Sequence, residues 1–105
     1  MAKKVNSQDY QEFNEKRFTK KDLFKLETST VFMLNFLPGQ AMPAHRHPGH
    51  DLIFNCLQGS GELSLGEETF KIQNTDTVYG NGDEMIAFTN TSDEKASIQV
   101  VMYEK

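Results

Sequence analysis

The sequence predicts a single all-β domain, either a β-sandwich or a closed β-barrel, from three observations. Short runs of β-forming residues recur about every ten residues from Leu23 to Tyr103. Gly, Asn and Asp separate these runs, a spacing typical of sandwiches and barrels and unlike that of a sheet with helical crossovers. A length of 105 residues allows one hydrophobic core and therefore one domain.

The first twenty residues are polar, and their aromatic residues Tyr10, Phe13 and Phe18 are isolated. We expect an amphipathic turn, an N-terminal arm or an edge strand there. A regular β pattern then begins. Its first two expected strands are 23–26 and 31–37, with a turn between them and Pro38-Gly39 after the second.

Strands and turns alternate again after a histidine-rich segment at 45–50. Gly59-Ser60-Gly61 stops the first of these strands, and Gly66-Glu67-Glu68 predicts a hairpin turn. The expected strands of this part are 52–57, 62–65, 69–72, 77–79, 85–88 and 97–103.

Composition excludes several classes of protein. With 37% hydrophobic and 25% charged residues the chain is an ordinary globular one, and its net charge of −4 is not that of a nucleic-acid or membrane-surface binder. The single cysteine, Cys56, has no disulfide partner within the chain. Since the N-terminus lacks the apolar region of a secretion signal, we expect a cytoplasmic protein.

All three histidines, His45, His47 and His50, fall within six positions, and Asp51 follows directly. Imidazole and carboxylate groups are common ligands of transition metals. On an extended strand the side chains of residues i and i+2 lie on the same face, so His45 and His47 are expected to converge on one point.

The third ligand is less determined, because His50 and Asp51 are adjacent and face opposite ways on a strand. If Asp51 faces inward, Ile53, Asn55 and Leu57 share its face. If His50 faces inward, the more apolar set of Leu52, Phe54 and Cys56 follows it. That composition favours His50.

The stretch from Gly39 to Gly59 resembles the first motif of the cupin superfamily. That motif has a glycine, five residues, His-X-His, three or four residues and then an acidic ligand, matched here by His45, His47 and Asp51. Two departures are Asp in place of Glu and one extra residue before Gly59. The second cupin motif resembles residues 76–90, but Met85 stands where that motif has its histidine.

The resemblance implies a jelly-roll barrel over 30–105, preceded by an N-terminal arm and first strand over 1–29. It also implies a divalent transition metal (Fe, Mn, Ni, Cu or Zn) held by His45, His47 and Asp51, with His50 as the alternate ligand. The fourth protein ligand would be missing, or replaced by water, Tyr79 or Glu84. Thioether sulfur is a poor match for most of these ions, so Met85 is expected in the pocket wall.

Two functions follow from these expectations. One is a metal-dependent enzyme, oxygenase-like or an isomerase, acting on a small organic molecule that Asn55 and Tyr79 orient in the pocket. The alternative is a non-catalytic cupin that binds a small ligand beside a degenerate metal site. In both cases we expect a homodimer, because unpaired strand edges can be covered across a two-fold axis, and no nucleic-acid or membrane partner.

Overall fold

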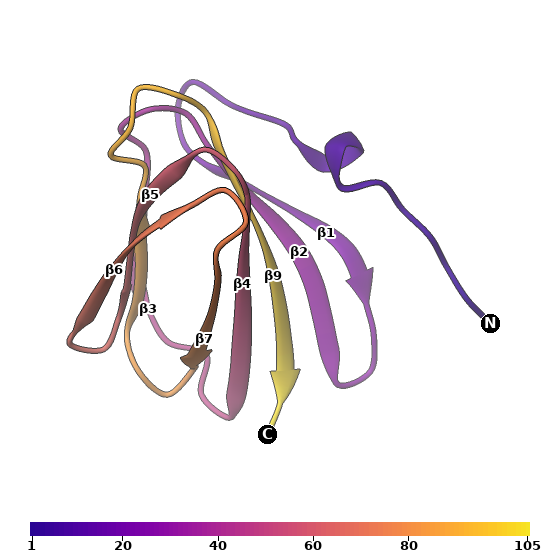
Figure 1. The fold of residues 1–105 in the computed structure, drawn as a ribbon. Helices are drawn as coiled ribbons and strands as arrows, with labels where there is room; N and C mark the ends of the chain where they lie inside the picture. Colours follow the sequence, from indigo (N-terminus) through magenta and orange to yellow (C-terminus); the bar gives the residue numbers. More distant parts are fainter.

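The computed structural model describes residues 1–105, most of which form two antiparallel β-sheets packed face to face (Figure 1). The larger sheet has five strands in the order β1-β2-β9-β4-β7, and the smaller has four in the order β3-β8-β5-β6. From β2 onward the chain passes repeatedly between the sheets, as in a jelly roll or double-stranded β-helix. The predicted all-β fold class is confirmed.

The expected strands all overlap observed ones. The larger sheet contains β1 (Thr19–Lys25), β2 (Ser29–Phe36), β4 (His50–Gln58), β7 (Thr77–Asn81) and β9 (Ala96–Glu104). The smaller sheet contains β3 (Ala41–His45), β5 (Ser60–Leu65), β6 (Glu68–Gln73) and β8 (Ile86–Thr89). Strand β1 starts earlier than expected, at Thr19, because its polar residues pair with β2 at the edge of the sheet.

The hydrophobic core lies between the sheets. Along β4 the burial alternates, with Leu52, Phe54 and Cys56 buried in the core and the intervening residues half-exposed. The facing sheet contributes Leu63, Leu65 and Phe88. This alternation is the consequence of a sheet covered on one face.

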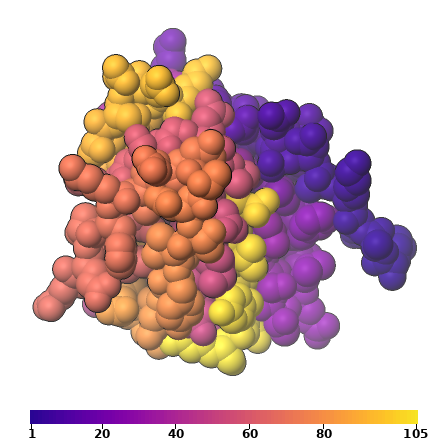
Figure 2. Space-filling model, in the orientation of Figure 1, coloured from indigo at the N-terminus to yellow at the C-terminus, as the bar shows by residue number.

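The N-terminal arm crosses the outer face of the larger sheet. A short 3-10 helix, η1 (Ser7–Tyr10), begins this contact, and the buried Asn35 amide donates to the Tyr10 carbonyl at 2.8 Å. The Gln40 amide donates to the Asn14 carbonyl at 2.7 Å. The residues before η1 project from one side of the molecule (Figure 2). No helix of the chain is long and apolar enough to cross a membrane.

Candidate functional site

A cavity of about 370 Å³ lies between the sheets on the inner face of β1, β2, β4 and β9. Nine of its thirteen lining residues are hydrophobic. The hydrophobic lining comprises Phe18, Phe32, Leu34, Met42, Ala44, Leu52, Phe54, Ile86 and Val100, and Pro43 also lines the cavity. Its polar groups are the side chains of Lys20, His45 and His47. Small-molecule sites commonly have this size and this mixture of apolar wall and few polar groups.

The two histidines converge, as their spacing predicts. His45 ends β3 and His47 lies just beyond it, and their Nε2 atoms are 3.0 Å apart. The rings meet edge to face, with centroids 4.8 Å apart. The His-X-His segment therefore places both imidazoles at one point of the cavity wall.

Hydrogen bonds determine where the protons of this pair lie. The Nδ1 atom of His45 is 2.8 Å from the Pro43 carbonyl, which only accepts, so this nitrogen carries a proton and donates. In the neutral pair His45 Nε2 then has a free lone pair, and His47 Nε2–H donates to it. Each ring thereby provides the hydrogen-bond partner of the other ring's Nε2 atom, and no further ligand is needed there.

The environment of His47 favours its neutral form. Burial lowers the pKa of the His47 imidazole, and the neighbouring His45, Lys20 and His50 lower it further. A desolvated ring close to other positive groups is harder to protonate. This part of the cavity wall thus combines a His47 ring that resists protonation with the nearby lysine.

Gly82 fixes the backbone that carries the histidines. The His47 N–H donates to the Gly82 carbonyl, and the Gly82 N–H donates to the His50 carbonyl, both at 2.8 Å. A Cβ at position 82 would overlap the carbonyl oxygens of His47 and His50. The glycine that resembles part of the second cupin motif is therefore required by close packing of two backbones.

The pair fits two positions around a metal ion but not a complete ligand set. Two nitrogens about 2.0–2.1 Å from one ion are separated by roughly 2.8–3.4 Å at bond angles between 90° and tetrahedral, and the observed separation of 3.0 Å lies in this range. The bond from His45 Nδ1 to Pro43 also resembles the outer-shell support of metal-bound imidazoles. However, no group of three or more His, Cys, Asp or Glu side chains is arranged to hold a metal.

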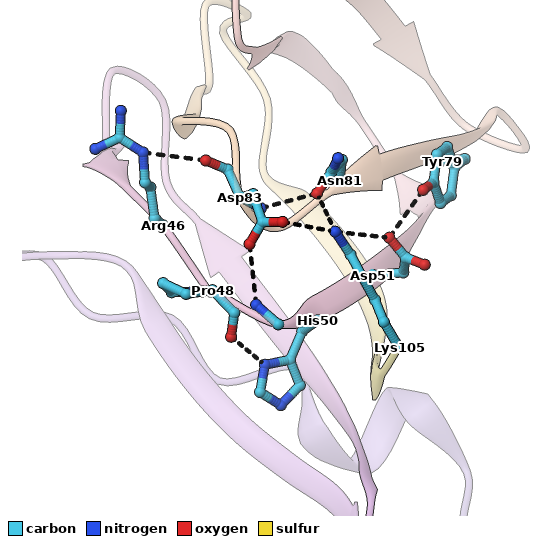
Figure 3. Close-up of polar contacts among 9 residues, drawn as sticks. Arg46, Pro48, His50, Asp51, Tyr79, Asn81, Asp83 and Lys105 are labelled. Atoms are coloured by element: carbon cyan, nitrogen blue, oxygen red, sulfur yellow. Dashed lines mark hydrogen bonds and ion pairs between the residues drawn. The ribbon is translucent and has the colours of Figure 1, made fainter.

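Asp51 does not join the histidines, contrary to the expected ligand set. Strand parity turns it to the outer face of β4, where its Oδ1 accepts a 2.8 Å hydrogen bond from the Tyr79 hydroxyl (Figure 3). This bond raises the pKa of the Tyr79 phenol. Both residues lie outside the cavity lining, because the buried set of Leu52, Phe54 and Cys56 occupies the inner face.

The remaining expected site residues also lie away from the cavity. His50 bonds through Nδ1 to the Pro48 carbonyl at 3.0 Å and does not line the cavity, although it is near enough to affect His47. Asn55 accepts a bond from the Thr77 hydroxyl on the outer face. The backbone carbonyl of Met85 accepts a hydrogen bond from the Gly66 N–H. Met85 does not line the cavity.

A polar network on the outer rim holds the turn that contains Gly82. The Lys105 amine donates to Asn81 Oδ1 at 2.7 Å and lies 2.8 Å from Asp83 Oδ2, and Asp83 Oδ1 accepts from the Gly49 N–H (Figure 3). The Lys105 ammonium and the Gly49 N–H lower the pKa of Asp83. The carboxylates of this region thus stabilise loops and do not face the cavity.

Lys20 and Phe18 are among the lining residues that were not expected from the sequence. Lys20 lies on the exposed edge strand β1, and Phe18 stacks on Phe36 with ring centroids 5.1 Å apart. Nothing in a polar segment of alternating charges marks one lysine as different from the next. Only the pairing of Lys20 with Leu34 across β1 and β2 places it at the cavity.

A family description, "Cupin domain", matches residues 32–103, which is more than half of the chain. The chain therefore belongs to the cupin family, as the resemblance of its histidine segment predicts. No curated protein matches the sequence significantly.

Several solved structures share this fold. A Thermus thermophilus protein is 23% identical, with 95% of each chain covered and a TM-score of 0.91. An uncharacterized Klebsiella pneumoniae protein with a double-stranded β-helix domain is 15% identical, with 99% of this chain and 91% of that chain covered and a TM-score of 0.91. The cupin domain of an Enterobacter cloacae XRE family transcriptional regulator is 18% identical, with coverages of 84% and 97% and a TM-score of 0.78. At these identities the likeness shows the fold alone.

Proposed function

We propose that this cupin binds a small, mainly apolar organic molecule in the cavity between its sheets. The supporting observation is the cavity itself, about 370 Å³ with three polar side chains in a largely hydrophobic wall. Its volume is at the lower end of ordinary small-molecule sites, roughly 300–1,000 Å³, which indicates a small ligand.

The chemistry of the wall favours burial of apolar surface. The two histidines bond to each other, and no buried side-chain nitrogen or oxygen of the protein lacks a hydrogen-bond partner. Water in the cavity therefore gains little from the wall, and an apolar ligand gains about 25 cal/mol for each Å² it removes from water. The rings of Phe32 and Phe54 offer flat surfaces for such a molecule.

Titration with 3-phenylpropanol and toluene, followed by amide NMR shifts, tests the proposal. We expect shifts at lining residues such as Leu34 and Val100, and a decrease of these shifts in Ala44→Phe, which places a larger side chain in the cavity lining. Ala41→Phe on the same strand is the control, because Ala41 is exposed and does not line the cavity. If neither probe shifts the lining residues at millimolar concentration, the proposal is wrong.

A second candidate, metal binding at His45 and His47, is favoured by their 3.0 Å Nε2 separation. A divalent transition ion would bind the two imidazoles, with water or a ligand in its remaining positions. A metal-dependent activity on a small organic molecule, oxygenase-like or an isomerisation, would require such an ion. Elemental analysis of untagged protein, and calorimetry with Zn²⁺ and Ni²⁺, should show binding that His45→Ala abolishes. If the parent protein and His45→Ala gave equal heats of Zn²⁺ and Ni²⁺ binding, this candidate would be wrong.

We also propose that the chain forms a homodimer. Strands β1 and β7 are the edges of the larger sheet, and β3 and β6 those of the smaller. Exposed aromatic residues, Tyr79 on β7 and Phe70 on β6, lie at two of these edges. Light scattering should give twice the 12.0 kDa chain mass at micromolar concentration. A particle of one chain mass would contradict the proposal.

A further inference from the structure

Lys20 is the one permanently charged side chain in the cavity lining. It lies on β1, which is the edge of the larger sheet, and it is exposed. Its register partner Leu34 lines the same cavity, so Lys20 projects on the inner side of the sheet at the open end of the cavity. A charge at this position meets any ligand that enters.

The Lys20 ammonium has no carboxylate partner. It lies 4.6 Å from the centroid of the Phe32 ring, and none of the ion pairs of the protein includes it. Asp22, two residues further on the same strand, is not within ion-pairing distance of it. By contrast, the next residue, Lys21, points to the other face and pairs with Glu12 at 2.7 Å. Lys20 is therefore held by an aromatic ring, an attraction weaker than a charge-assisted hydrogen bond.

The cavity contains no negative group that would complement a cationic ligand. None of its thirteen lining residues is Asp or Glu, although the chain as a whole has a net charge of −4. Asp51, which follows His50 directly, and Asp83, which accepts a hydrogen bond from the Gly49 N–H, both face the outer rim. The charge of the site is thus opposite in sign to that of the whole protein.

We propose that the ligand of this cavity is an apolar carboxylic acid in its ionised form, with the carboxylate on Lys20 Nζ at the open end and the apolar body between Phe32 and Phe54. This inference rests on the proposed function and names the class of its ligand. Lys20 acts as the anchor that gives the ligand one orientation, and the histidine pair forms part of the wall.

Binding exchanges a weak interaction for a stronger one without moving the lysine far. The aliphatic part of Lys20 can remain on the Phe32 ring while the ammonium turns to the carboxylate. A ligand with the same body and a positive charge would be repelled by Lys20.

Three probes with one body and different charges test the inference: 3-phenylpropanoate, 3-phenylpropanamide and 3-phenylpropylamine. We expect calorimetry at low salt to show the carboxylate binding roughly tenfold more tightly than the amide, about 1.4 kcal/mol, and the amine binding most weakly. The preference for the carboxylate should decrease at high salt, because Lys20 is exposed and its charge is screened.

The variant Lys20→Met retains the apolar stem and removes the charge. It should weaken binding of 3-phenylpropanoate about fivefold or more and leave binding of the amide unchanged. Lys25→Met is the matched control, because Lys25 is exposed on the same strand, has no ion pair and does not line the cavity. It should bind all three probes as the parent does.

The outcomes separate this inference from the proposed function. If the amide binds in the cavity and the carboxylate binds no more tightly, or if Lys20→Met does not reduce the difference, the anchor role of Lys20 is wrong and the ligand-binding proposal stands. If the amine binds most tightly, the inferred sign of the ligand charge is wrong. If no probe changes the amide NMR shifts of Leu34 and Val100, both the ligand-binding proposal and the anchor role of Lys20 fail.

Discussion

The two faces of strand β4 differ in chemistry, although their residues alternate along one nine-residue segment. On the inner face Leu52 and Phe54 are at most 2% exposed and form the cavity wall. On the outer face Asp51 and Asn55 form side-chain hydrogen bonds with residues of β7. One face thus provides a binding surface, and the other ties strands together.

The comparison explains why proximity in sequence is a poor guide to the site. Asp51 is four residues from His47, yet it bonds to Tyr79, which is 28 residues away. Lys20 is 25 residues before His45, yet both line the cavity. Strand parity and strand pairing decide which residues meet.

The largest expected difference between the faces is in stability. Phe54→Ala should lower the free energy of unfolding by about 3–5 kcal/mol, because it removes a buried ring and enlarges a cavity. Ile53→Ala, on the outer face, should cost about 1 kcal/mol, since its side chain is only half-buried. Urea unfolding measures the free energy of unfolding of both variants. Equal losses of stability would contradict the assignment of Phe54 to the inner face and Ile53 to the outer face.

Gly82 tests how the outer rim supports the inner site. Gly82→Ala should cost about 1–3 kcal/mol, because the added Cβ overlaps the backbone oxygens of His47 and His50. It should also change the NMR shifts of the His47 ring. Gly39→Ala is the control: its φ of +82° adds strain, but its Cβ would have no atom within 4 Å. Unchanged His47 shifts in Gly82→Ala would contradict the support role.

The histidine pair predicts a pH effect confined to the inner face. The NMR titration midpoint of His47 should lie below 6.5, mainly because of burial, and His45→Ala should raise it by removing a neighbouring ring that disfavours protonation of His47. Because the lowered pKa means that the unfolded chain binds more protons, the His47 contribution to stability should fall as pH decreases below 6.5. A midpoint at or above 6.5 would contradict the desolvation of the His47 ring at the cavity wall.

The smallest expected effect is a local one on the outer face. Asp51→Asn removes the charged acceptor of the Tyr79 hydroxyl, so the pKa of Tyr79 should fall toward its ordinary value near 10.0. The pH dependence of the NMR shifts of the Tyr79 ring carbons measures this pKa. Asn55→Ala is the control on the same face, since Asn55 bonds to Thr77 and not to Tyr79. Binding of 3-phenylpropanol should be unchanged in both variants.

Much of the fold follows from local pattern. The alternation of apolar residues over 52–57 and the turn residues Gly59, Gly61 and Gly66 predict strands that the structure contains. Polar edge segments are harder to recognise, and β1 is the example. Its first four residues are Thr19, Lys20, Lys21 and Asp22, which have no β pattern and form a strand only by pairing with β2.

The site is predictable only where it depends on local geometry. His45 and His47 converge because two residues on one extended segment share a face. The choice between His50 and Asp51 has a local signal as well, in the apolar character of Leu52, Phe54 and Cys56. The cupin resemblance pointed to Asp51 instead, and the packed structure turns Asp51 outward.

The sequence by itself determined the all-β class, the family and the convergence of the two histidines, since each follows from local patterns and motif spacing and not from which distant strands pair. Only the tertiary structure decided that Asp51 belongs to the outer rim and that Lys20 faces the cavity. The physical reason is that these placements depend on the register between strands distant in the chain, where a shift of one residue exchanges the two faces of a strand.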